Sequence, residues 1–190
     1  MTFNKIDEIR IKNVKEKVEK SLGKLLLDLP MALCNFLFDS SILSGGAIAS
    51  LVHDERPNDY DLYLKDNNLI TFFNQYLSEM ANTAHKDLIK DANEKYYDSG
   101  KIPGKMVTAN ATTFKNGIQV ITLHASNARN TFDFVHCMPW YDIGLNKLHI
   151  SYKQYDAIIH KRLIKNGHGH ANPLSQKRVE KYTDRGWRFK

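Results

Sequence analysis

The 190-residue chain has few of the features that would point to an oxidising compartment or a membrane. Its two cysteines, Cys34 and Cys137, form neither a disulfide framework nor a metal-binding spacing, so we expect a reduced, cytoplasmic environment. No apolar run approaches the length of a membrane span, and the charged N-terminus lacks the apolar stretch of a secretory signal. Repeats and low-complexity tracts are also lacking, so we expect a single globular domain without a membrane partner.

The chain does carry a moderate excess of positive charge. Its 27 lysines and arginines outnumber the 21 aspartates and glutamates, and the net charge of +6 favours acidic partners such as nucleotides or nucleic acid. The densest positive region is the C-terminal segment, which contains Lys177, Arg178 and Lys181. Judged from its residues alone, this segment is either the solvated face of an amphipathic helix or a phosphate-binding surface.

The stretch with the clearest chemistry begins with two adjacent glycines, Gly45 and Gly46. Apolar residues follow at helical spacing between residues 48 and 52, which predicts a glycine turn that opens a short helix. Adjacent glycines let the backbone approach a ligand closely, and the first turn of a helix has unpaired N–H groups that suit a phosphate. We expect the hydroxyl groups of Ser44 and Ser50 to add to this phosphate site.

An acidic strand follows at residues 58–64. Period-two alternation places Asp59, Asp61 and Tyr63 on one face, with apolar residues on the other. Carboxylates two residues apart on a strand lie about 6–7 Å apart and point the same way, so they repel each other unless a cation lies between them. Hard oxygen ligands suit Mg²⁺. A phosphate site followed by a divalent-metal site is typical of phosphoryl or nucleotidyl transfer.

This order of motifs resembles the polymerase β-type nucleotidyltransferase superfamily. The resemblance rests on Gly45-Gly46 and on the later Asp59-Tyr60-Asp61, and it covers roughly residues 41–137. The double glycine, together with the approach through Pro57 and Asn58, is similar to the catalytic heads of tRNA nucleotidyltransferases and poly(A) polymerases. Those heads usually carry a basic–acidic pair after the glycines, where this chain has Ala49-Ser50.

The resemblance also implies a third catalytic carboxylate, on a strand that follows a hairpin. Asp133 matches that position, and the composition of residues 131–137 predicts a strand. An aspartate is unusual inside a strand, so Asp133 is either this carboxylate or an edge residue that faces water. Together with Asp59 and Asp61, Asp133 would hold two Mg²⁺ ions, or Mn²⁺ in their place. These ions would bind the triphosphate and activate an acceptor hydroxyl.

The remaining patterns predict an α+β protein with a small mixed sheet flanked by helices. Helices are expected at residues 6–25, 31–38 and 155–163, after a cap at Asn67 or Asn68, and from Ser175 onward. A short strand at residues 41–43 and a hairpin at residues 106–124, with an Asn116-Gly117 turn, supply the sheet. Residues 81–105 are polar and are expected to form an insertion.

The resemblance refines this architecture to a nucleotidyltransferase fold. It implies a catalytic domain at residues 1–144, with its core at 41–137, and a C-terminal helical lobe at residues 145–190. It also implies that Lys177, Arg178 and Lys181 of this lobe reach the triphosphate. Asn110 on the hairpin either lines the nucleotide pocket or follows the solvent-side alternation.

Several other residues carry weaker signals. Asp54, Glu55 and Asp66 have no partner at a useful spacing, so we expect them to be solvated surface charges. His136 is expected to be a hydrogen-bonded core histidine, and its neighbour Cys137 is not expected to be a nucleophile, because adjacent residues of a strand face apart. The glycine-spaced pair His168 and His170 provides no fixed metal geometry, and its role is left open.

The leading functional hypothesis is a magnesium-dependent nucleotidyltransferase that moves a nucleoside monophosphate from an NTP, such as ATP, to an acceptor hydroxyl and releases pyrophosphate. RNA 3′ ends are slightly favoured as acceptor, and proteins and small molecules stay open. The alternative is a non-catalytic module that binds nucleotide or nucleic acid on the same fold. Hydrolysis by the same aspartates is a minor third possibility.

Overall fold

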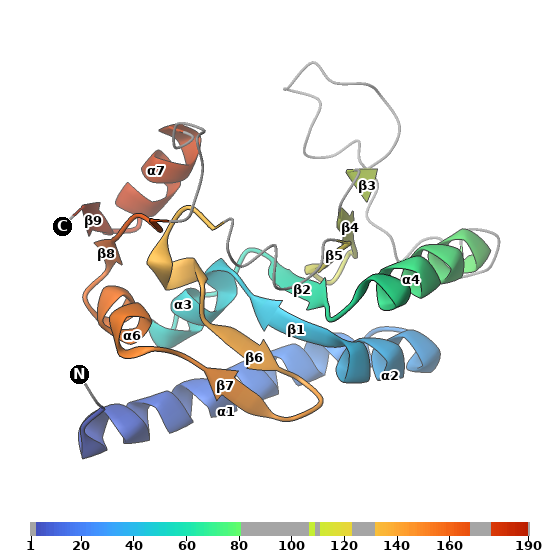
Figure 1. Cartoon of the computed structure of the whole chain (residues 1–190), viewed down its shortest axis with the longest axis horizontal. Helices are drawn as coiled ribbons and strands as arrows, with labels where there is room; N and C mark the ends of the chain where they lie inside the picture. The colour runs from blue at the N-terminus through green and yellow to red at the C-terminus, as the bar shows by residue number, and fades with distance from the viewer. Residues whose placement is uncertain (1–2, 81–106, 109–110, 123–131, 168–175, 190) are drawn as a thin grey trace.

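The computed structural model describes residues 3–80, 107–108, 111–122, 132–167 and 176–189 (Figure 1). Seven of the described strands form one sheet in the order β3-β4-β5-β2-β1-β6-β7. The strands are β1 (Ser41–Ser44), β2 (Tyr60–Leu64), β3 (Val107–Thr108), β4 (Ala111–Thr113), β5 (Ile118–Ile121), β6 (Trp140–Asp142) and β7 (Lys147–His149). Only β2 and β5 pair in parallel, and the other pairs in this sheet are antiparallel.

The sheet is flanked by helices, as expected for an α+β protein. The six described α-helices are α1 (Lys5–Leu27), α2 (Met31–Ser40), α3 (Gly46–Val52), α4 (Asn67–Met80), α6 (Tyr152–Ile159) and α7 (Gln176–Thr183). A separate two-stranded parallel pair joins β8 (Arg162–Leu163) to β9 (Arg188–Phe189). None of the described helices is both long and apolar enough to cross a membrane.

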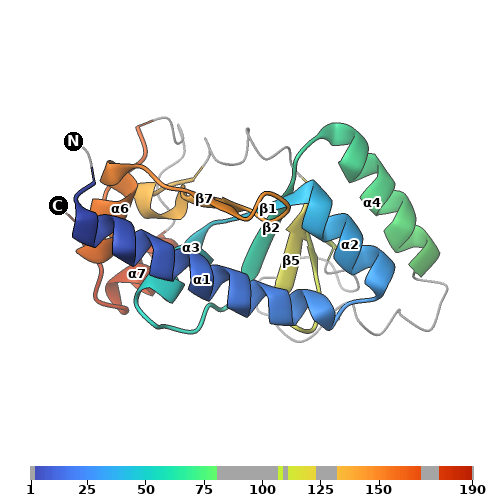
Figure 2. The ribbon, with the colours of Figure 1, turned by 90° about the horizontal axis from the view of Figure 1, so that it is seen from below.

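The main core lies between the sheet and the N-terminal helices, where α1 runs beneath the strands (Figure 2). Apolar residues recur every four positions along α1 and present one buried stripe, formed by Val14, Val18, Leu22 and Leu26. The stripe joins the cluster that contains the inward-facing Leu43 of β1 and Leu62 of β2. Because successive strand residues face opposite sides, Ile42 and Tyr63 lie in a different, smaller cluster.

The hairpin prediction is confirmed in its central part. Ala111 pairs with Ile121, Thr113 pairs with Gln119, and the turn between these strands contains Asn116 and Gly117, which has a φ of +92°. The side chain of Asn116 accepts a hydrogen bond from the backbone N–H of Ile118 and donates one to the carbonyl of Leu25. The N-terminal part of the predicted strand instead forms β3, which pairs with β4.

The predicted strand at residues 131–137 is wrong. Within the described residues, Phe134 makes only an isolated antiparallel bridge with Lys165, and residues 135–137 form a 3₁₀ turn. Phe134, Val135, His136 and Cys137 are all buried, so this short run has the burial of a core strand without its geometry. A short apolar run has no periodicity from which a buried strand can be told apart from a buried helical turn.

One helix end and one helix cap also differ from the predictions. The helix expected to reach residue 163 ends at Ile159, and the chain then turns at Lys161, whose φ is +47°, so that Leu163 lies in β8. At the start of α4, the cap is supplied by Asp66, whose side chain accepts a hydrogen bond from the N–H of Leu69. Asp66 is therefore a helix cap and not merely a solvated charge.

Candidate functional site

A cavity of about 300 Å³ lies where the glycine turn meets the acidic strand. Its wall is built from distant parts of the chain: the turn between β1 and α3, the entry to β2, the segment that precedes the 3₁₀ turn, and α7. Eight of the residues predicted for the site line this one cavity. They are Gly45, Gly46, Ser50, Asp59, Asp61, Asp133, Arg178 and Lys181, and the last two form the cationic side on α7.

Gly45 is required by the local geometry. Its φ of +99° and ψ of −158° lie in a region that is essentially restricted to glycine. A Cβ atom built on Gly45 would also lie 2.8 Å from Oδ2 of Asp61. The N–H group of Gly45 donates to the carbonyl of Cys137 at 3.0 Å, so this N–H is already used within the protein. The glycine therefore lets the carboxylate of Asp61 lie directly against the turn.

Asp61 is the most perturbed carboxylate of the cavity. It pairs across the sheet with Ser44 of β1, and it follows Asp59 by two residues. Burial, followed by the negative charge of Asp59, raises the pKa of Asp61 to about 6, although Lys181 and Arg178 act in the opposite direction. A carboxyl pair with this perturbation favours an added cation, because positive charge beside it would offset the repulsion.

Asp133 reaches the same cavity although it is not on a strand. Its side chain is 11% exposed, and its carboxylate forms an ion pair with the guanidinium of Arg178 on α7. The backbone carbonyl of Asp133 accepts a hydrogen bond from the N–H of Asn166 at 2.9 Å, which helps to hold this segment in place. Asp133 thus links the segment before the 3₁₀ turn to the cationic helix.

The carboxyl pair and Asp133 differ in their fitness for a metal ion. Asp59 and Asp61 provide hard oxygen ligands next to each other, which is the chemistry that Mg²⁺ prefers. Asp133 is bonded to Arg178 instead. Among the residues that the structure describes, no three carboxylate, imidazole or thiol groups gather closely enough to hold a metal ion. The donor set therefore fits an ion at the Asp59–Asp61 pair.

Some predicted phosphate-binding groups lie elsewhere or are already bonded. The Ser44 hydroxyl is fully buried and donates to the carbonyl of Pro139 at 2.8 Å, and Ser44 is not part of the cavity wall. Ser50 lines the cavity, but its hydroxyl donates to the carbonyl of Gly46 at 3.1 Å. Lys177 is exposed on α7 outside the cavity wall. Asn110, His168 and His170 lie outside the described residues.

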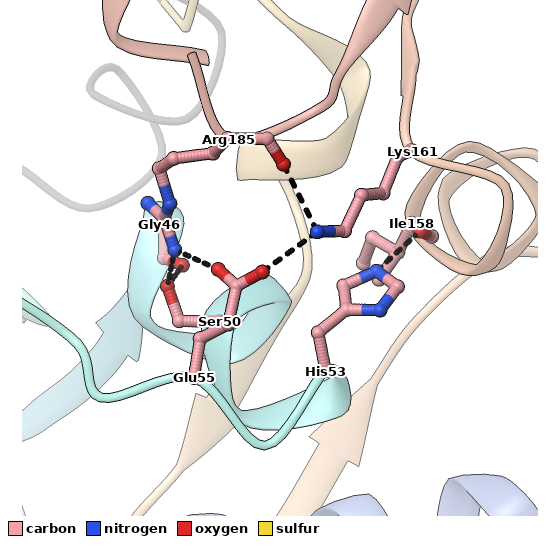
Figure 3. Close-up of polar contacts among 7 residues, drawn as sticks. All are labelled: Gly46, Ser50, His53, Glu55, Ile158, Lys161 and Arg185. Carbon is pink, nitrogen blue, oxygen red and sulfur yellow. Dashed lines mark hydrogen bonds and ion pairs between the residues drawn. The ribbon is translucent and has the colours of Figure 1, made fainter. Parts of the chain in front are cut away.

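A network of polar contacts holds the C-terminal segment against α3 (Figure 3). The guanidinium of Arg185 donates to the Ser50 hydroxyl at 2.8 Å and to the carboxylate of Glu55, and Lys161 donates to the same carboxylate at 2.7 Å. Lys161 also donates to the carbonyl of Arg185 at 3.0 Å. His53 lies beside this network, with its ring Nε2 2.8 Å from the carbonyl of Ile158.

This network corrects the expectation that Glu55 is a solvated charge. Burial raises the pKa of Glu55, but the hydrogen bonds from Lys161 and Arg185 and their positive charges outweigh that effect and hold the pKa below its usual value. Both partners are more than 100 residues away along the chain. No spacing in the sequence could have indicated these contacts.

Behind the cavity, an aromatic cluster packs α7 onto the 3₁₀ turn. The ring of His136 is fully buried, with centroid distances of 4.0 Å to Trp187 and 4.5 Å to Tyr182. Burial, with a smaller effect of Arg185, lowers the pKa of His136 to about 3. His136 is therefore a neutral core histidine, but neither ring nitrogen has a hydrogen-bond partner within the described part of the chain.

Cys137 is poorly suited to act as a nucleophile. Its Sγ lies 3.1 Å from the hydroxyl of Tyr182, and burial raises the pKa of its thiol to about 11. The reactive thiolate is therefore scarce at neutral pH. Tyr182 itself lines the cavity, and a Cβ atom on Gly46 would lie 3.2 Å from its hydroxyl oxygen. Sequence patterns gave no indication of this contact between the glycine turn and α7.

Gln119 is a further cavity residue that the sequence did not single out. It lies on β5, in register with Asp61 of the parallel neighbour β2. Its side-chain amide donates to the hydroxyl of Thr113 at 3.0 Å, which fixes the amide at the edge of the cavity. Its place became visible only once β2 and β5 were known to be neighbours.

Comparison with known proteins agrees with this fold. No curated protein sequence matches the chain. Among solved structures, the Thermotoga maritima CCA-adding enzyme complexed with tRNA is 13% identical with a TM-score of 0.54, and the match covers 88% of this chain and 42% of the enzyme. A complex of CCA-adding enzyme with ATP is 13% identical with a TM-score of 0.51, covering 88% of this chain and 41% of that one. The chain therefore spans less than half the length of these enzymes.

At this level of identity the likeness concerns the fold alone, and it confirms the predicted nucleotidyltransferase fold. The sequence itself matches one family over most of its length, from residue 12 to residue 162. This chain, with its nucleotidyltransferase fold, belongs to the Gabija anti-defense 2 family.

Proposed function

We propose that this protein is a magnesium-dependent nucleotidyltransferase that moves a nucleoside monophosphate from an NTP to an acceptor hydroxyl. One observation carries the proposal: a single cavity brings together the glycine turn, three carboxylates and two cationic side chains of α7. These groups lie on segments that are far apart in the sequence. The structural likeness to CCA-adding enzymes, among them complexes with tRNA and with ATP, supports the proposed nucleotidyltransferase function.

In this proposal the cationic side of the cavity binds the triphosphate. Arg178 and Lys181 line the cavity and would neutralise phosphate oxygens. Arg178 would exchange the carboxylate of Asp133 for a phosphate oxygen, which would end the ion pair between the two side chains. The N–H groups in the first turn of α3 have no acceptor within the helix, and they would add hydrogen bonds to the phosphates.

Asp59 and Asp61 would hold Mg²⁺, or Mn²⁺ in its place. When bound, the ion would offset the charge of the triphosphate and favour ionisation of the acceptor hydroxyl. The acceptor oxygen would then form a bond to the α-phosphorus while the bond to the bridging oxygen breaks and pyrophosphate leaves. Asp133 would take the proton of the acceptor hydroxyl once Arg178 has moved to the phosphates.

RNA 3′ ends are the acceptor that we favour, and protein and small-molecule hydroxyls are the other classes to test. The name of the family also makes a component of the Gabija defence a specific protein acceptor to include. A non-catalytic binding module is the second candidate function. The ion pair between Asp133 and Arg178 favours it, because this pair occupies the third carboxylate.

A transfer assay separates the two functions. Each α-labelled NTP is incubated with the protein, Mg²⁺ and an acceptor from each class, and label in the acceptor is measured. We expect label in at least one acceptor class, and loss of that label with EDTA and with Asp61→Asn. Lys147→Ala, an exposed change on β7 away from the cavity, serves as the control. Nucleotide binding without transfer to any acceptor would favour the binding module.

A further inference from the structure

A second concavity, of about 650 Å³, adjoins the candidate active site. It is lined by residues of α1, of the segment that joins α3 to β2, and of the turn between β4 and β5. Asn58 and Asp59 line both this groove and the cavity with the three carboxylates. A molecule bound along the groove can therefore reach the predicted metal ligand Asp59 without crossing the body of the protein.

The groove is rich in cations. Five positively charged side chains from its three walls line it, namely Lys17, Lys20, Lys24, Arg56 and Lys115. Three acidic residues also line it, but two of them are already paired. Asp54 is 2.7 Å from Lys17, and Glu55 is bonded to Lys161 and Arg185. Among the described residues, Lys20, Lys24, Arg56 and Lys115 form no ion pair.

The cations are arranged along the groove. Lys17, Lys20 and Lys24 lie on one face of α1 and span about 10 Å of its axis. Lys20, Lys24, Arg56 and Lys115 are all exposed. The walls are joined by direct contacts: Asn116 donates to the carbonyl of Leu25 at 2.8 Å, and the hydroxyl groups of Ser21 and Tyr60 are hydrogen-bonded. The row of charges is therefore held by structure that exists before any ligand binds.

The lining fits a nucleic-acid strand better than a protein. Protein–protein interfaces usually have an apolar or aromatic centre, whereas protein–nucleic-acid interfaces are more polar and much more positive. Tyr60 and Phe114 of the groove are buried in the core, and none of the exposed large hydrophobic side chains that the structure describes lies in its lining. The groove thus offers charge along its length, and Leu25 and Leu51 are the partly exposed members of its aliphatic and aromatic lining.

We propose that this groove binds the backbone phosphates of single-stranded RNA and guides the 3′ end past Asn58 to Asp59. The binding of RNA stands on the groove alone, whereas its role as the acceptor path rests on the proposed transferase function. Contacts of this kind are to phosphates, so we expect little dependence on RNA sequence and a strong dependence on salt.

The test compares two triple variants of the same chain. The groove variant is Lys20→Ala, Lys24→Ala and Lys115→Ala, and the control is Lys5→Ala, Lys12→Ala and Lys147→Ala. All six lysines are exposed, and the control lysines do not line the groove or the cavity. Each protein is titrated with a labelled single-stranded RNA of mixed sequence, without nucleotide, over a series of salt concentrations.

We expect the groove variant to bind RNA at least about tenfold more weakly than the control at low salt. Each phosphate contact contributes about 0.7 to the slope of log affinity against log salt for a single strand, so loss of three contacts should reduce that slope by about 2. Equal binding and equal slopes for the two variants, or absence of RNA binding by the wild type, would overturn the proposal. Displacement of the bound RNA by polyglutamate, added at equal charge concentration, would also overturn the proposal.

A transfer arm keeps the two proposals apart. With RNA as acceptor, the groove variant should show a raised KM for RNA, while kcat and the KM for NTP match the control. RNA binding through the groove lysines without transfer to any acceptor would refute the transferase and leave the RNA site standing. Transfer to RNA at equal RNA KM in both variants would refute the groove and leave the transferase standing.

Discussion

At the scale of single residues, Asp61 shows how the site stores unfavourable electrostatic energy. A carboxylate whose pKa is raised to about 6 is more costly to ionise in the folded chain than in the unfolded chain, where its value is near 3.8. Folding therefore favours the protonated form of Asp61. The contribution of this protonated carboxyl to the stability of the folded chain is fully present below pH 3.8 and is lost as the pH rises through 6. At neutral pH, ionised Asp61 therefore destabilises the metal-free protein.

Asp61→Asn should accordingly stabilise the metal-free protein at pH 7.5 by up to about 3 kcal/mol, and should have little effect near pH 4. Urea unfolding in EDTA at both pH values measures this difference. The exposed Asp184→Asn serves as the matched control and should be nearly neutral at both pH values. An Asp61→Asn effect that does not change between pH 4 and pH 7.5 would contradict the assignment.

Gly45 gives the second prediction at this scale. Gly45→Ala places a side chain at a φ of +99° and within 2.8 Å of the Asp61 carboxylate. We expect Gly45→Ala to lower the free energy of unfolding by about 1–3 kcal/mol. For a chain of this size, that change lowers Tm by roughly 2–12 °C in a thermal melt. Gly167→Ala is the control, because a Cβ atom there meets nothing within 4 Å among the described residues. Equal Tm values for the two variants would refute the requirement for glycine.

The sequence allowed part of this site to be predicted. The period-two spacing of Asp59 and Asp61 and the adjacent glycines follow from local geometry, and these residues do share one cavity. The expected role of Ser44 was less successful, because its hydroxyl is bonded to Pro139, which is 95 residues away. The proximity of Gly45 to Asp61 depends on the pairing of β1 with β2, and a linear sequence does not state this pairing.

At the scale of elements, the position of α7 decides whether the site has a cationic side. α7 is short and carries Arg178 and Lys181, and the residue that ties its C-terminal end to α3 is Arg185. The carboxylate of Glu55 bonds both Arg185 and Lys161. Removal of that charge leaves two half-buried cations without their partner, which is more costly than the loss of an exposed ion pair.

We therefore expect Glu55→Gln to lower stability by about 2 kcal/mol at neutral pH and to raise the KM for NTP. Because the pKa of Glu55 is lowered in the folded state, its stabilising contribution is present above pH 4.5 and is lost as the pH falls through the lowered value. The loss caused by Glu55→Gln should thus shrink in acid. Asp54→Asn, which removes an exposed pair with Lys17, should cost less than about 1 kcal/mol.

Elements with a strong local signal were predicted well. The long amphipathic pattern of α1 and the Asn116-Gly117 turn each carry enough local information to specify their structure. Residues 134–137 carry less, because their burial comes from α7 and from Trp187, which pack on them from the end of the chain. The composition of such a segment indicates that it is buried, but it does not indicate whether its backbone forms a strand or a turn.

At the scale of the whole molecule, the apolar core and the charged site are separate. The largest buried cluster joins α1, α2 and one face of the sheet, while the three carboxylates line a cavity beside the glycine turn. Stability therefore comes mainly from apolar burial, and the repulsion between Asp59 and Asp61 opposes it. The core needs no divalent ion, and an ion is expected to act at the site, where its binding would offset this repulsion.

Thermal melts with and without ligand test this separation. EDTA alone should leave the Tm of the nucleotide-free protein unchanged, because no described core residue depends on a metal. Addition of NTP with Mg²⁺ at about 100 times the dissociation constant should stabilise the protein by about 2.7 kcal/mol, a Tm rise of roughly 5–11 °C, and EDTA should reverse it. Asp59→Asn should abolish this rise while its ligand-free Tm does not fall. A fall in Tm with EDTA alone would instead show that a bound metal supports the fold, and a nucleotide effect that persists in EDTA would contradict a metal-dependent site at Asp59 and Asp61.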